Sequence, residues 1–112
     1  MAFTANLETT NDIGKIKLAG ELDASSAPIF KAEIEKAAAE SVKRLVLLME
    51  DLEYMASAGL RVLIFAKQKM GAKADIYVVG AQEMVLDTLQ KTGYDQSVIV
   101  LEQYDAAQIE NV

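Results

Sequence analysis

The stretch that decides the fold is Leu45-Val46-Leu47-Leu48-Met49, a continuous apolar run. Such a run, without polar alternation, is typical of a strand that is buried on both faces, as in a parallel sheet. Parallel strands are joined by crossover connections that usually contain a helix. The stretch therefore predicts that helices and strands alternate on either side of it.

The segment downstream of this strand follows that expectation. Gly71 and Gly93 each come directly after a helical pattern, where a glycine suits a helix C-terminus. The side chains of Val85, Leu86 and Leu89 are spaced to face a core. The predicted elements are helices over residues 60–70 and 82–92, strands over 76–79 and 98–101, and a short last helix capped by Asp105.

The segment upstream predicts a hairpin and a first helix. Residues 3–9 and 13–19 alternate apolar and polar side chains around the turn-forming pair at 11–12, which is the pattern of a β-hairpin. Ser25 and Ser26 precede a proline, so one of them is expected to cap a helix that ends near Glu40.

The whole chain therefore predicts one α/β domain over residues 1–112. Its expected order is ββαβαβαβ(α), with a mixed, mostly parallel sheet and an antiparallel N-terminal strand. The composition supports this, because 52% of the 112 residues are hydrophobic and 25% are charged. A domain of this size buries most of its surface without covalent cross-links.

The composition excludes much enzyme chemistry. Because the chain contains neither histidine nor cysteine, a serine–histidine triad, a cysteine nucleophile and a typical zinc site are impossible. No phosphate-binding loop or dinucleotide fingerprint occurs. We therefore expect no catalytic residues, no metal and no cofactor, and a role as an enzyme or small-molecule binder is the least favoured hypothesis.

The charge and hydropathy pattern bears on location and partners. The formal net charge is -6, which disfavours nucleic acids and anionic membranes as partners. No apolar stretch approaches the roughly 20 residues of a membrane span, and the N-terminus lacks the pattern of a signal peptide. The expected location is the cytoplasm, without membrane insertion.

The acidic residues Glu50, Asp51 and Glu53 follow the buried strand directly. Carboxylates at that edge of an open α/β sheet could hold magnesium. The acidic and lysine partners of a phospho-acceptor aspartate are not evident elsewhere in the sequence. The interpretation favoured here is a solvated acidic loop.

Ser57 lies between this strand and the next helix. A hydroxyl there meets unpaired backbone N–H groups and the positive end of the helix dipole, so an added phosphate would be stabilised locally. The small residues Ala58 and Gly59 would let another protein approach it closely. The alternative is that Ser57 is only a helix N-cap, worth about 1 kcal/mol.

The chain resembles the STAS domains of bacterial anti-sigma factor antagonists over roughly residues 3–104. The matching features are Gly20-Glu21-Leu22-Asp23, the strand followed by Tyr54-Met55-x-Ser57-Ala58-Gly59-Leu60, and the order of elements through Thr92-Gly93-Tyr94. Many members carry aspartate where this chain has Ala56.

The resemblance implies an anti-sigma factor antagonist that works by partner switching. The unphosphorylated form would bind a serine kinase that is often the anti-sigma factor itself, and phosphorylation of Ser57 would release it. A metal-dependent serine phosphatase would reset the switch. The alternative is a STAS scaffold subunit of a membrane transporter that docks on its ATPase.

The expected partner surface surrounds Ser57, and Asp23 is expected beside it. Arg61, one turn later, is expected to contact a partner or shield the phosphate, or to be simply exposed. Met55 is expected to be at least partly exposed, whereas Met49 and Met84 are expected in the core and Tyr54 and Tyr94 at its edge. The predicted partner-binding residues are Glu21, Asp23, Ser25, Met55, Ala58, Gly59, Leu60 and Arg61.

Overall fold

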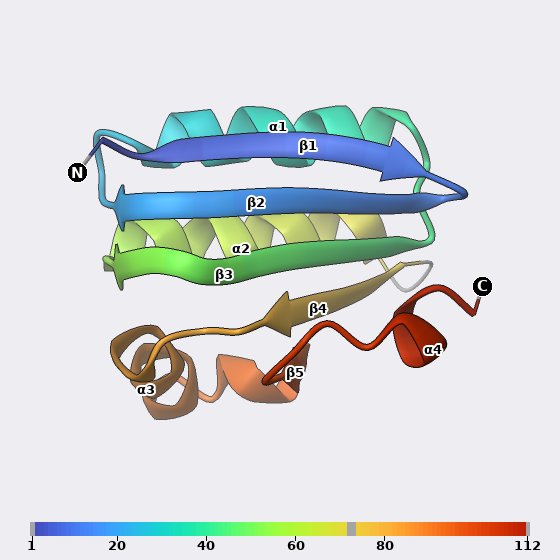
Figure 1. Ribbon diagram of the computed structural model, residues 1–112. Helices are drawn as coiled ribbons and strands as arrows, with labels where there is room; N and C mark the ends of the chain where they lie inside the picture. The colour runs from blue at the N-terminus through green and yellow to red at the C-terminus, as the bar shows by residue number, and fades with distance from the viewer. Residues whose placement is uncertain (1, 72–73, 112) are drawn as a thin grey trace.

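A computed structural model describes residues 2–71 and 74–111 and shows a single sheet with two helices packed behind it (Figure 1). The elements are β1 (Thr4–Thr10), β2 (Ile13–Leu22), α1 (Ala27–Ala39), β3 (Arg44–Met55), α2 (Ser57–Met70), β4 (Asp75–Val79), α3 (Glu83–Lys91), the 3₁₀ turn η2 (Tyr94–Gln96), β5 (Ile99–Leu101) and α4 (Ala106–Ile109).

The sheet has the strand order β1-β2-β3-β4-β5. β1 and β2 form the predicted antiparallel hairpin, and β2 through β5 are parallel to their neighbours. The carboxyl ends of β2, β3 and β4 therefore point to one edge, where α1, α2 and α3 begin (Figure 1). The predicted mixed, mostly parallel sheet and the predicted order of elements are confirmed.

The main core lies between the sheet and the helices α1 and α2. Alternating side chains of the central strands enter it, among them Ile16 and Leu18 from β2 and Leu45 and Leu47 from β3, all with no exposed surface. A smaller apolar cluster forms on the opposite face of the sheet around Val46. Burial of both faces explains why the stretch at 45–49 is uniformly apolar.

The predicted C-termini of α2 and α3 and the predicted N-terminal cap of α4 are confirmed. Gly71 and Gly93 follow α2 and α3 with φ angles of 67° and 74°, a backbone conformation that favours glycine. Asp105 caps α4, because its side chain accepts a hydrogen bond from the Gln108 N–H.

The prediction of an acidic loop after the buried strand was wrong. β3 continues to Met55, because its pairing with β2 resumes after two register shifts and runs on to the pair Leu22 and Met55. Leu52 and Met55 are buried in this extension, and the acidic side chains point to solvent between them. Sheet pairing and the burial of these apolar residues outweigh the low strand propensity of Glu50 and Asp51.

The prediction for Met84 was also wrong, since 59% of this residue is exposed. Met84 is in the first turn of α3, and only Val85 and Leu89 of that helix are fully buried. Leu86 is partly buried. Met49 lies in the core as predicted.

Candidate functional site

Ser57 is the first residue of α2, at the edge of the sheet where the parallel strands end. Ala56, not Ser57, is the N-cap residue, and its N–H donates to the Leu22 carbonyl at 2.8 Å. Ser57 is exposed, and within residues 2–71 and 74–111 its hydroxyl has no hydrogen-bond partner. The helix-cap interpretation of Ser57 is therefore wrong.

Gly59 fixes the position of this helix terminus. It is buried, and a Cβ atom there would lie 2.6 Å from Cδ2 of Leu22 and 3.1 Å from Cγ of Met55. The glycine thus lets the first turn of α2 rest directly on the ends of β2 and β3. Its small size therefore serves packing within the domain.

Met55 was expected to be at least partly exposed, but only 3% of it is. It ends β3 and points into the main core, where its side chain supports Gly59. The neighbouring Tyr54 is instead 42% exposed. The register shift with β2 skips Glu53, so Met55 reaches the same core as Leu52 while Tyr54 stays on the exposed side.

Asp23 organises the turn between β2 and α1. Its carboxylate accepts hydrogen bonds from the Ser25 hydroxyl at 2.7 Å, the Ser25 N–H at 3.0 Å and the Ser26 N–H at 3.1 Å. The bond from the Ser25 hydroxyl, and then that from the Ser26 N–H, hold the pKa of the Asp23 carboxyl below its ordinary value. Asp23 therefore stays ionised and orders the turn that leads into α1, whose N-cap residue Ser26 makes no side-chain capping bond, so the predicted serine cap was wrong.

Ser26 is the N-cap residue of α1 by position, but its hydroxyl serves the same turn. It is 7% exposed, accepts a hydrogen bond from the Asp23 N–H at 2.9 Å and donates to the Glu21 carbonyl at 3.0 Å. Because Leu22 also binds Ala56, this turn and the start of α2 form one connected edge. Asp23 and Ser57 thus lie at the same edge, as the resemblance implies.

The other predicted partner-binding residues vary in exposure. Glu21, Ser25 and Arg61 are exposed, and Ala58 and Leu60 are partly buried. Arg61 follows Ser57 by one helical turn, so both side chains lie on one face of α2. The structure thus places an exposed hydroxyl and an exposed arginine on one face of the first turns of α2.

Tyr94 occupies the edge of the core as predicted, and its hydroxyl donates to the Leu63 carbonyl at 2.7 Å. Burial raises the pKa of the Tyr94 hydroxyl. The residue therefore ties the segment after α3 to the middle of α2, and it takes no part in the edge around Ser57.

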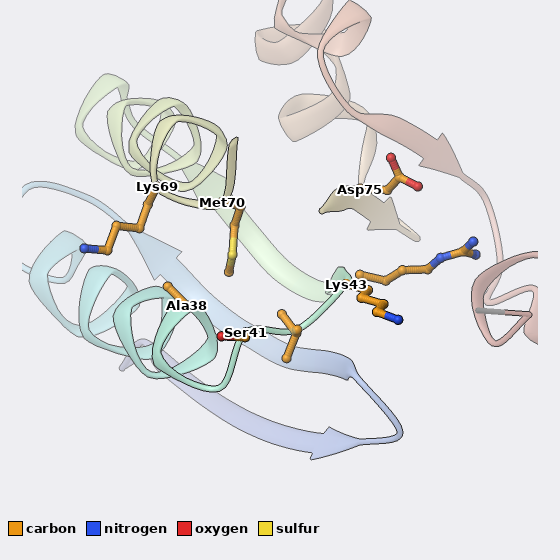
Figure 2. Close-up of a pocket in the computed structure, with 8 residues that line it drawn as sticks. Ala38, Ser41, Lys43, Lys69, Met70 and Asp75 are labelled. Carbon is orange, nitrogen blue, oxygen red and sulfur yellow. The ribbon is translucent and has the colours of Figure 1, made fainter. Parts of the chain in front are cut away.

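A hollow of about 540 Å³ lies at the opposite edge of the sheet, where α1 and α2 end and β3 begins (Figure 2). The Arg44 guanidinium beside it donates a hydrogen bond to the carbonyl of Ile109 at 3.2 Å. The hollow is lined by Ala38, Ser41, Val42, Lys43, Arg44, Lys69, Met70 and Asp75.

Among residues 2–71 and 74–111, no group of acidic side chains is arranged to hold a metal ion.

A mixed sheet of this topology, with an exposed serine at the first position of its second helix, defines a small α/β domain. The sequence model of the STAS domain matches residues 4–107. The chain therefore belongs to the STAS domain family. It is also 22% identical over 96 residues to the anti-sigma-F factor antagonist RsfB of Mycobacterium tuberculosis, spanning 86% of this chain and 79% of RsfB.

Solved structures show the same fold. An anti-sigma factor antagonist from Mycobacterium paratuberculosis superposes with a TM-score of 0.89 at 22% identity, covering 98% of this chain and 96% of the other. The anti-sigma factor antagonist SpoIIAA in its unphosphorylated form gives 0.79 at 21% identity, with 97% and 94% covered. The phosphorylated form of the Bacillus SpoIIAA gives 0.71 at 19% identity, with 97% of both chains covered.

No helix within the described ranges, 2–71 and 74–111, is long and apolar enough to cross a membrane.

Proposed function

We propose that this protein is a cytoplasmic, non-enzymatic anti-sigma factor antagonist, switched by phosphorylation of Ser57. The unphosphorylated form binds an anti-sigma factor that is also a serine kinase, and a metal-dependent serine phosphatase restores it. The observation that carries the proposal is the exposed Ser57 hydroxyl, without a partner among the described residues, at the first position of α2.

The relatives support the same role. RsfB and SpoIIAA are anti-sigma factor antagonists, and SpoIIAA exists in phosphorylated and unphosphorylated forms. A domain with this fold therefore tolerates a phosphate group. The chain also lacks the histidine and cysteine on which many enzymes of this size rely.

The local geometry explains how a phosphate would change binding without unfolding the domain. Phosphoserine adds about -1.5 to -2 charges at neutral pH. The first N–H groups of α2 and the guanidinium of Arg61 lie on the same turn and would stabilise that charge. The added charge falls on an exposed surface that the partner must cover closely when it binds the unphosphorylated protein, so binding is lost on phosphorylation.

The test compares partner binding by the wild type with binding by Ser57→Asp, Ser57→Ala and Ser41→Asp. The last variant is the matched control, because it adds the same charge at an exposed serine on the opposite edge of the sheet. Aspartate also tolerates the positive φ of 54° at that position. Each protein is used as bait in a lysate of its source, bound proteins are identified by mass spectrometry, and folding is checked by thermal unfolding.

We expect a kinase-type ATPase to bind the wild type, Ser57→Ala and Ser41→Asp, and binding to Ser57→Asp to fall at least tenfold. Added ATP should release the partner from the wild type but not from Ser57→Ala. Equal binding by wild type and Ser57→Asp, with both folded, contradicts the switch. Transporter subunits held by every bait would instead support the scaffold role.

A further inference from the structure

The outer side of β1 is an edge of the sheet. β1 is the first strand in the order β1-β2-β3-β4-β5, so within residues 2–71 and 74–111 no strand pairs with that side (Figure 1). An unpaired strand edge presents backbone N–H and C=O groups to other chains, and proteins protect such edges with lysine, proline or very short strands. β5, at the opposite edge, has three residues, whereas β1 has seven, without lysine or proline.

One side chain of α1 occupies the β1 edge instead. The Leu7 N–H donates a hydrogen bond to Oε1 of Glu33 at 3.1 Å, so this N–H points away from β2. Oε2 of Glu33 lies 2.7 Å from the Lys36 ammonium, and only 12% of the Glu33 side chain is exposed. A carboxylate is seldom buried this far without compensating partners, and here they are one ammonium and the N–H of an edge strand.

Leu7 lies at the centre of this edge. Along an antiparallel strand, the backbone groups of successive residues point alternately toward the partner strand and away from it. The N–H groups of Ala5 and Thr9 therefore point outward with that of Leu7, and these three residues are called here the outer row. Because Leu7 is the middle residue of β1, the outer row is symmetric about it.

This symmetry fits a second copy of the same chain. A two-fold axis would bring two outer rows together antiparallel, with Leu7 opposite Leu7 and Ala5 opposite Thr9. Glu8, the single charged residue of β1, would then face Asn6 of the other copy, so no like charges would meet. The Glu33 carboxylate occupies the central N–H that such pairing requires.

We propose that the outer row of β1 is a pairing site for a second copy of this chain, and that Glu33 keeps it closed. While the carboxylate is bound to the Leu7 N–H, it takes the place of the other copy's backbone. When the carboxylate leaves, two copies join through β1 into one continuous sheet. The inference does not rest on Ser57, and its test does not depend on the outcome for the proposed switch.

The variant Glu33→Ala opens the edge, and Glu33→Gln is its matched control. Both remove the charge, but the glutamine amide keeps an oxygen that can accept from the Leu7 N–H. Glu35→Ala is a second control, which removes the same charge from an exposed position on the same helix. The dimer dissociation constant of each full-length protein is measured by sedimentation equilibrium over a wide range of concentrations, and folding is checked by urea unfolding.

We expect Glu33→Ala to dimerise at least tenfold more tightly than the wild type, because the freed N–H gains a backbone acceptor only by pairing. Glu33→Gln and Glu35→Ala should stay within about threefold of the wild type, since rim charges alone contribute little. A Glu33→Ala protein that dimerises no more tightly than the wild type would overturn the proposal. An equal increase in Glu35→Ala would do the same, because the cause would then be net charge.

A proline shows whether the dimer forms through the outer row. Thr9→Pro removes one outward N–H, and proline is tolerated at a sheet edge where the N–H faces away from the neighbouring strand. Thr9→Val is the matched control, because it also loses the bond from the Thr9 hydroxyl to Glu40 but keeps the N–H. In the Glu33→Ala background, Thr9→Pro should weaken the dimer to the wild-type level, and Thr9→Val should leave it tight.

A dimer of Glu33→Ala that persists with Thr9→Pro would place the contact elsewhere and overturn the proposal. If the proline variant does not fold, hydrogen exchange of the Ala5 and Thr9 amides in Glu33→Ala decides the question. Exchange at both amides should slow as the protein concentration rises, because pairing protects them. Exchange that is independent of concentration while the dimer forms would contradict pairing through β1.

Discussion

The N-termini of α1 and α2 begin at the same edge of the sheet, yet their serines are in opposite situations. At α1, Ser26 is 7% exposed and bonded to the backbone on both sides, and the Asp23 carboxylate binds the N–H groups of Ser25 and Ser26 just before the helix. At α2, Ala56 is the N-cap residue, and the Ser57 hydroxyl is exposed and has no partner in the described chain.

The two helix termini are held in place in different ways, and this decides whether the nearby serine hydroxyl is already engaged in hydrogen bonds. Hydrogen bonds position α1, and they engage the side chains of Asp23, Ser25 and Ser26. The start of α2 is positioned by contact between Gly59 and Leu22 and by one backbone bond, from Ala56 to Leu22. This arrangement needs no side-chain hydroxyl, so the Ser57 side chain is not required to hold the helix terminus.

The largest effect should come from filling the space that Gly59 leaves. Gly59→Val would place a branched side chain against Leu22 Cγ, which lies 2.7 Å from where a Cβ would be. Leu22 is fully buried and has little room to move. We expect the free energy of unfolding to fall by about 1–3 kcal/mol, measured by urea denaturation.

Ala58→Val is the matched control for this change. It adds the same side chain one residue earlier, at a partly buried position, and should cost less than about 1 kcal/mol through helix propensity. If the two variants are equally stable, contact with Leu22 does not position the start of α2, and the contrast between the two helix termini fails.

The next prediction compares the two serines directly. Ser26→Ala leaves the Asp23 N–H and the Glu21 carbonyl without their partner in a buried turn, so unfolding should become easier by about 1–2 kcal/mol. Ser57→Ala removes no bond and should change stability by less than about 0.5 kcal/mol. Urea unfolding of both variants checks this, and a loss at Ser57 as large as that at Ser26 would return Ser57 to a structural role.

The sequence predicted the fold well because its signals are local. The run at 45–49, the hairpin and the glycines after α2 and α3 each depend on the chain's own periodicity and backbone preferences. The prediction failed at residues 50–55, where pairing with β2 extends the strand against local propensity. Strand extension is a tertiary effect, and the acidic composition concealed it.

The site was predicted in part for the same reason. The position of Ser57 at a helix N-terminus follows from a strand, small residues and a helix in sequence. The sequence could not show that Gly59 faces inward or that Met55 is buried, because both depend on Leu22 from another strand. It also gave Ser26 and Ser57 the same cap interpretation, since only tertiary geometry separates them.

The smallest predicted effect is a pH dependence of the free energy of unfolding that comes from Asp23, before α1, and has no counterpart at Ser57. Hydrogen bonds from Ser25 and Ser26 lower the pKa of Asp23 in the folded protein relative to the unfolded chain. The folded state therefore binds that proton less readily, and the resulting stability is present in full above the ordinary aspartate pKa of about 3.9. It is lost as the pH falls from there through the lowered folded pKa.

Asp23→Asn removes this titration, so the difference in urea midpoint between wild type and variant should be greatest near pH 7 and shrink below pH 4 or so. Because Asp23 is partly exposed, the change should be smaller than that of Ser26→Ala. The urea midpoint of Ser57→Ala should vary with pH in parallel with that of the wild type, since no carboxylate is bonded to the Ser57 hydroxyl in the described residues. A difference for Asp23→Asn that does not vary with pH would mean that the carboxylate's charge does not stabilise the turn, and that its hydrogen-bonding shape alone orders the turn before α1.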